Sequence, residues 1–83
     1  MFRVEWEASA SDQFATIAMT HVDRWRDINA ADNEINYLLQ RDPLSHSQPI
    51  SEGLRRAIVD PIAIYFSLDG ETVRVEAIGW IES

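Results

Sequence analysis

The residues best suited to chemistry lie in one stretch, "GLRRAIVDPIAIYF", which covers residues 53–66. Arg55 and Arg56 are adjacent cations, and Tyr65 lies in the middle of the next apolar run. A guanidinium can hold a phosphate or a carboxylate through two parallel hydrogen bonds. The stretch therefore indicates either a small site for an anionic partner or a wall of the core that carries polar residues on one side.

Each candidate has a structural alternative. Arg55 and Arg56 face opposite ways in a strand, and either could form a surface ion pair, with Glu52 and Glu76 the nearest acids to consider. Tyr65 suits a strand as a packed aromatic residue. Two further residues, Arg74 and Trp80, are candidates for binding; Trp80 could also close the core.

Histidine and serine residues give weaker signals. His21 and His46 lie far apart in the sequence, and neither has a second ligand at a spacing typical of a zinc site, so we predict no metal and no cofactor. Ser45 and Ser47 flank His46, but neighbouring positions in a chain do not make a nucleophile–base pair. We interpret this segment as a loop.

The amino-acid composition argues against several classes of protein. The chain has 83 residues, a formal net charge of −7, no cysteine, and arginine as its only strongly basic residue type. An acidic chain lacks the basic footprint typical of nucleic-acid binding, so any such contact depends on local arginines. No apolar run is long enough to cross a membrane. We expect one small cytoplasmic domain, without disulfides, over residues 1–83.

Hydrophobic periodicity predicts the elements. Residues 2–7 alternate as a half-buried strand, and apolar residues at helical spacing then run from residue 12 to residue 39, with capping residues expected at Ser9 or Ser11 and at Asp23. Asp42-Pro43 ends this helical region. We expect a loop over residues 43–53, then strands over residues 54–59, 62–68 and 72–78, the last two joined by an Asp69-Gly70 turn.

These elements give an α+β fold in the order β-α-α-β-β-β, with a helical hairpin on one face of an antiparallel sheet. We expect five strand residues to face the helices, and the alternate positions, including Tyr65, Arg74 and Trp80, to face solvent. The five are Ile62, Ile64, Phe66, Val73 and Val75. On the opposite, open face we place Ala63, Tyr65, Ser67, Arg74, Glu76, Ile78 and Trp80.

The order of elements and three sequence stretches resemble the RelE/ParE superfamily of type II toxins. The helical region ends in "LQRDP" (residues 39–43), "PISEGLRR" (residues 49–56) leads into the strands, and Tyr65 stands where a tyrosine usually closes the next strand. The resemblance covers essentially the whole chain. It implies a toxin-antitoxin (plasmid stabilisation) function, with a cognate antitoxin as partner and with the ribosome and its mRNA, or DNA gyrase, as target.

For a ribosome-dependent mRNA interferase, the resemblance implies catalytic roles for Arg55 and Tyr65 and binding roles for Arg56, Arg74 and Trp80. Family members commonly carry an arginine where this chain has Ile62, and the family's lysines have no counterpart here. The alternative is a non-catalytic binding module on the same scaffold. In that case the open face or an edge strand takes an antitoxin-like peptide or another copy of the chain, as in a homodimer.

Overall fold

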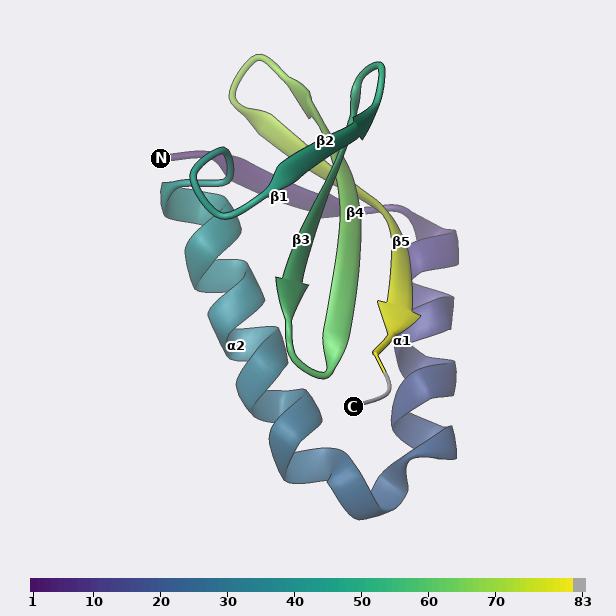
Figure 1. The fold of residues 1–83 in the computed structure, drawn as a ribbon. Helices are drawn as coiled ribbons and strands as arrows, with labels where there is room; N and C mark the ends of the chain where they lie inside the picture. Colours follow the sequence, from purple (N-terminus) through teal and green to yellow (C-terminus); the bar gives the residue numbers. More distant parts are fainter. Residues whose placement is uncertain (82–83) are drawn as a thin grey trace.

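The computed structural model describes residues 1–81 (Figure 1). Strand β1 spans Arg3–Trp6, and helix α1 spans Ala8–Thr20. A short 3-10 turn, η1 (Val22–Arg24), joins α1 to helix α2 (Trp25–Arg41). Four strands follow: β2 (Gln48–Ser51), β3 (Leu54–Val59), β4 (Ile62–Asp69) and β5 (Thr72–Trp80). The predicted β-α-α-β-β-β layout is confirmed, with one additional strand.

The five strands form one mixed sheet in the order β1-β5-β4-β3-β2. β2, β3, β4 and β5 are antiparallel neighbours, whereas β1 runs parallel to β5, with Val4 opposite Val73. The sequence predicted a fully antiparallel sheet, and the parallel pairing of β1 with β5 shows that this part of the prediction is wrong. Parallel neighbours need a long connection, and here the helical hairpin and strands β2, β3 and β4 lie between β1 and β5 in the chain.

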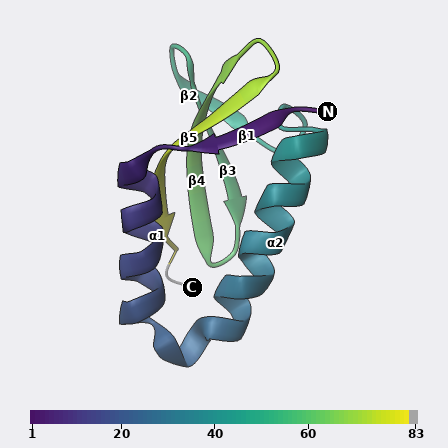
Figure 2. The ribbon, with the colours of Figure 1, turned by 180° about the vertical axis from the view of Figure 1, so that it is seen from behind.

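The two helices diverge from their common turn, and the strands lie between them in both views (Figures 1 and 2). α1 packs against β5, and α2 contacts β1 and β3. The core cluster joins Ala10 of α1, three residues of α2 and the apolar face of β3, β4 and β5. The five strand residues that were predicted to lie in the core are all fully buried. They are Ile62, Ile64, Phe66, Val73 and Val75.

A β-bulge in β5 changes which residues face the helices. Phe66 pairs with Val75 and Tyr65 pairs with Ala77, so Glu76 is an extra residue without a partner on β4. From that point the alternation along β5 is inverted, and Ile78 pairs with Ile64 on the helix side. Ile78 is only 6% exposed. The prediction that Ile78 and Trp80 belong to the open face is therefore wrong, because simple alternation does not allow for an inserted residue.

The bulge is supported by a side chain from α1. The backbone N–H of Ile78 donates a hydrogen bond of 2.8 Å to Oε1 of Gln13, which lies in the middle of α1. A backbone donor close to a bulge is left without its usual ladder partner, and a buried donor of that kind is costly. Gln13 thus fixes α1 to the irregular part of β5.

Three local predictions need correction. α1 begins at Ala8, with Glu7 rather than Ser9 or Ser11 as its N-cap residue. α2 begins at Trp25, after η1, so Asp23 does not cap it. The expected loop over residues 43–53 contains β2, a short edge strand whose four residues are all exposed. Pro49 concealed this strand in the sequence, although proline is tolerated on a sheet edge.

Candidate functional site

Arg56 and Tyr65 form the centre of the open face of the sheet. They are direct partners across the β3–β4 ladder, so their side chains leave the same face, with Cβ atoms separated by about 5 Å. Both side chains are half-buried. Gly79 lies beside them, since a Cβ built on it would be 3.8 Å from Cε2 of Tyr65. The tyrosine ring therefore lies close to the glycine, which has no side chain of its own.

Arg74 lies further along the same face, opposite Ser67 on β4. Its Nε is 3.5 Å from Oε1 of Glu7, and both side chains are nearly half exposed. An exposed ion pair of this length contributes less than about 1 kcal/mol, but it does neutralise the arginine. Arg74 thus extends the polar stripe of Arg56 and Tyr65 and adds little net positive charge to it.

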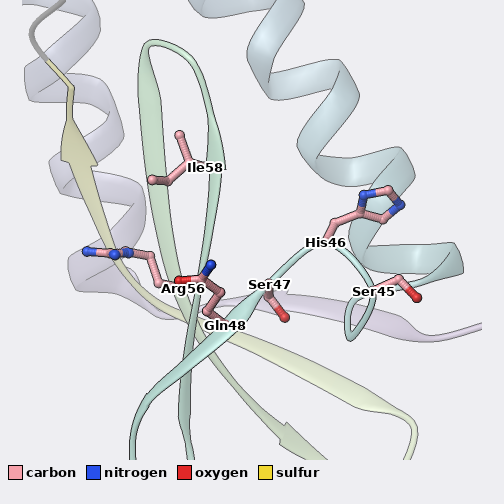
Figure 3. Close-up of a pocket in the computed structure, with 6 residues that line it drawn as sticks. All are labelled: Ser45, His46, Ser47, Gln48, Arg56 and Ile58. Atoms are coloured by element: carbon pink, nitrogen blue, oxygen red, sulfur yellow. The ribbon is translucent and has the colours of Figure 1, made fainter.

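Beside Arg56 lies an open cavity of about 430 Å³ between β3 and the segment that precedes β2 (Figure 3). The side chain of Arg56 points away from His46, whose ring turns toward α2 (Figure 3). The lining groups do not converge on one point, so the cavity offers a cation and hydrogen-bonding groups rather than a nucleophile–base pair. The lining residues are Ser45, His46, Ser47, Gln48, Arg56 and Ile58.

Sequence reasoning treated the segment of Ser45 and His46 as a loop without a role. The β2–β3 register shows why it belongs to the site: Gln48 is the partner of Arg56, which brings the preceding residues beside β3. The signal that could have located it was a strand at Gln48–Ser51. Because Pro49 interrupts that strand in the sequence, the pairing was not apparent.

Arg55 faces the other way from Arg56, as expected for neighbours in a strand. It pairs with Phe66, on the side of the sheet that the helices cover. Its guanidinium donates to Oγ of Ser47 at 2.8 Å, to the carbonyl of Ser47 at 3.1 Å and to the carbonyl of Leu44 at 3.4 Å. Ser47 Oγ in turn donates to the Pro43 carbonyl at 2.6 Å. Arg55 therefore holds the segment between α2 and β2 in place.

These contacts differ from the ion pairs considered for the two arginines. Among the ion pairs within residues 1–81, none joins Arg55 or Arg56 to Glu52 or Glu76. Arg55 is engaged by neutral oxygen atoms instead. Its predicted catalytic role remains a prediction, but the structure separates it from Tyr65 by the thickness of the sheet.

Trp80 lies apart from Arg56 and Tyr65, at the far end of β5. Its ring stacks on His21, with centroids 3.7 Å apart and planes inclined by 6°. The guanidinium carbon of Arg24 is 5.5 Å from the Trp80 centroid, and the hydrogen bond from Arg24 to Asp27 raises the pKa of that arginine. Trp80 thus joins β5 to the turn between the helices.

Six of the seven arginines have partners within the described part of the chain, and Arg56 is the exception. Arg3, Arg24 and Arg74 contact carboxylates, Arg26 and Arg41 lie over aromatic rings, and Arg55 bonds to Ser47 and Leu44. Arg56 is therefore the cation of the open face that is best placed to meet an external anion.

No family model matches the chain, and no curated protein matches it in sequence. Solved structures do match. A chain from the chromosomal ParDE toxin–antitoxin system of P. aeruginosa shares 19% identity at a TM-score of 0.77, covering 99% of this chain and 98% of its own. A chain from the toxin–antitoxin complex RelBE2 of Mycobacterium tuberculosis shares 17% identity at a TM-score of 0.78, covering 95% and 96%.

A third similar structure comes from the DinJ–YafQ complex of E. coli, with 19% identity, a TM-score of 0.67, and coverage of 96% of this chain and 93% of that one. All three matches span nearly the full length of both chains. The protein therefore has the RelE/ParE-like α+β fold, and the predicted resemblance is confirmed at the level of the fold. No helix within residues 1–81 has the length and apolar character that crossing a bilayer requires.

Proposed function

We propose that this protein is the toxin-type component of a type II toxin–antitoxin system and that a cognate antitoxin binds and neutralises it. The single observation that carries the proposal is the full-length likeness to chains from three toxin–antitoxin systems. The open face adds to it, because an exposed polar stripe on a sheet whose other face is covered is a surface that a target can reach.

Arg56 and Tyr65 supply the contacts that this function needs. A guanidinium without an internal partner can bind a phosphate bidentately, and a half-exposed tyrosine ring can stack on a base. Among the residues that line the cavity, His46 turns away from Arg56 rather than toward it (Figure 3). The proposed action on ribosome-bound mRNA therefore rests on binding and on stabilising charge at a phosphate, with Arg56 as the cation.

The first experiment is expression from an inducible promoter in a bacterial host. We expect growth arrest on induction, and relief of that arrest by co-expression of the small reading frame next to the gene. Arg56→Ala should restore growth to within about tenfold of the uninduced colony count, because the one unengaged cation of the open face is lost. Arg26→Ala, which removes an arginine of α2 that lies over Trp25, is the matched control and should leave the arrest in place.

Two readouts then separate the targets. If ribosome-bound mRNA is cut at new positions after induction, the target is translation. If purified DNA gyrase loses its supercoiling activity when the protein is added, the target is gyrase. If Arg56→Ala and Tyr65→Ala both arrest growth as strongly as the natural chain, the assignment of the site to the open face is wrong.

A non-catalytic binding module is the second candidate, and one observation favours it. With a net charge of −7 and six of seven arginines engaged internally, the surface repels a polyanion at long range. On this hypothesis, induction of the chain alone leaves growth unchanged, and its partner binds with little dependence on salt. A steep loss of affinity with added salt would instead indicate phosphate contacts.

A further inference from the structure

An apolar groove lies along α2 and shares one lining residue, His46, with the cavity beside Arg56. It is formed by the C-terminal half of α2 and the segment that follows it, and its volume is about 320 Å³. His46 contributes to it because its ring turns toward α2 (Figure 3). The lining residues are Glu34, Tyr37, Leu38, Arg41, Asp42 and His46.

Two large apolar side chains, one in the groove and one beside it in the sequence, are exposed within residues 1–81. Tyr37 is 62% exposed, and Leu44, which lies between the two lining residues Asp42 and His46, is 51% exposed. The guanidinium carbon of Arg41 lies 4.7 Å from the centroid of the Tyr37 ring. An exposed aromatic ring braced by an arginine, with leucine residues beside it, has the composition of an interface centre rather than of ordinary surface.

The charges around the groove define the partner. Glu34 and Asp42 carry exposed carboxylates, and neither takes part in an ion pair within residues 1–81. The nearby cation, Arg41, is already placed over Tyr37. The chain as a whole is also strongly acidic. A segment that approaches this groove therefore gains from positive charge at its rim, both in the contact and in long-range attraction.

We propose that this groove docks a basic amphipathic segment of a partner protein. Apolar side chains of the segment fill the space over Tyr37 and Leu38, and its lysine or arginine residues meet Glu34 and Asp42. The inference goes beyond the proposed function, since it concerns a different surface and holds whether or not the open face acts on a target. A groove of this size is smaller than a full interface, so the segment must extend over neighbouring parts of α2.

The test uses the full chain and two synthetic helical peptides of equal length, each with leucine on one face. One peptide carries lysine on its polar face and the other carries glutamate. We expect the lysine peptide to bind at least about tenfold more tightly, because its charges complement the rim. Its affinity should fall as salt screens that attraction, and amide shifts in NMR spectra should map to the groove residues.

Variants locate the contact. Tyr37→Ser should weaken binding of the lysine peptide by at least about tenfold, since truncation of a central aromatic contact is costly. Glu34→Gln should reduce the salt dependence. Ile58→Ser, at an apolar residue that is 53% exposed on the open face, is the matched control and should change nothing. Circular dichroism and thermal melting confirm that each variant is folded.

Three outcomes would overturn the proposal. Equal affinity for the two peptides would show that charge does not select the partner. Undiminished binding by Tyr37→Ser, or shifts spread over the whole acidic surface, would show that the lysine peptide binds without using the groove. Concentration-dependent dimerisation that strengthens with salt and is lost in Tyr37→Ser would assign the groove to a second copy of the chain instead.

Discussion

Two neighbouring arginines of β3, one on each side of the sheet, differ in whether they have hydrogen-bond partners. Arg55 faces the helix side and gives its hydrogen bonds to Ser47 and Leu44, whereas Arg56 faces the open side and has no partner within residues 1–81. The two residues are adjacent in sequence and equally basic. Their difference shows that the fold, rather than the residue type, decides which cation holds the structure together and which is free for a ligand.

The same contrast extends over the whole sheet. Apart from Arg55, the helix side consists mostly of buried aliphatic and aromatic residues, including Phe66 and Val75 at 0% exposure. The open side carries Tyr65, Ser67 and Arg74, all half-buried. Stability should therefore respond to changes on one side and binding to changes on the other, and the following predictions test that division from the largest expected effect to the smallest.

Insertion of one alanine between Ala77 and Ile78 should have the largest effect, because it adds a second extra residue to β5. The alternation along β5 would then either turn Ile78 and Trp80 toward the open side or force the strand out of register with β4. We expect a loss of at least about 3 kcal/mol in the free energy of unfolding, comparable to emptying a large core site. Glu76→Gln, which keeps the bulge, should unfold at nearly the same urea concentration as the natural chain.

Phe66→Ala should cost about 3–5 kcal/mol of unfolding free energy, since it removes a fully buried aromatic ring from the centre of the core. Its neighbour Tyr65 lies on the open side, and Tyr65→Ala should cost distinctly less. Urea denaturation followed by far-UV circular dichroism measures both. Equal losses for the two variants would contradict the division between the sides.

Arg55→Ala should destabilise the chain by about 1–2 kcal/mol, because it removes the donor to partly buried oxygen atoms of the segment before β2. Arg56→Ala should change the unfolding free energy by no more than about 0.5 kcal/mol. Hydrogen exchange should also speed up at Ser47 and Gln48 in the first variant alone. A larger loss of stability in Arg56→Ala would reverse the roles assigned to the pair.

The smallest effect concerns Asp32 of α2, a half-buried carboxylate on the helix side. Burial raises its pKa above the usual value, and a hydrogen bond of 3.4 Å from Asn36 opposes that shift. The folded state therefore holds the proton more tightly than the unfolded state, so this group favours folding at acidic pH and that contribution is lost as pH rises through its pKa.

Asp32→Asn should accordingly make the chain slightly more stable at neutral pH, with the difference shrinking as pH falls below the pKa of the carboxyl group. Urea midpoints measured for both chains across the acidic range check this. An asparagine variant that is less stable at neutral pH would mean that the charge of Asp32 contributes a favourable contact that outweighs its burial.

Much of the fold could be predicted from local pattern. The strand over residues 54–59 was predicted with the bounds that β3 has. The hairpin between β4 and β5 was predicted one residue too early: Asp69 still pairs with Thr72, and the turn consists of Gly70, with a φ of 63°, and Glu71. The end of α2 before Pro43 follows from the restricted backbone before proline. These features depend on a few consecutive residues, which is why the sequence reveals them.

The errors arise where distant residues decide the structure. The bulge at Glu76 depends on how β5 packs on β4 and on Gln13 of α1, and β2 depends on pairing with β3. The candidate site was predicted in part: Arg56 and Tyr65 come together, but Trp80 lies at the other end of β5 and Arg55 on the other side of the sheet. Strand alternation predicted that Arg55 and Arg56 would face opposite ways. Only the register of β3 against β4 shows which of the two arginines faces the open side.

The parallel pairing of β1 with β5 has a consequence for biosynthesis. Arg3 and Thr72 are neighbours in the sheet although nearly the whole chain separates them. Contacts of such long sequence separation form late, because a large loop must close before they are made. A nascent chain still attached to the ribosome cannot complete this sheet until its final strand has emerged. The pairing of β1 is therefore completed only after β5 has been synthesised.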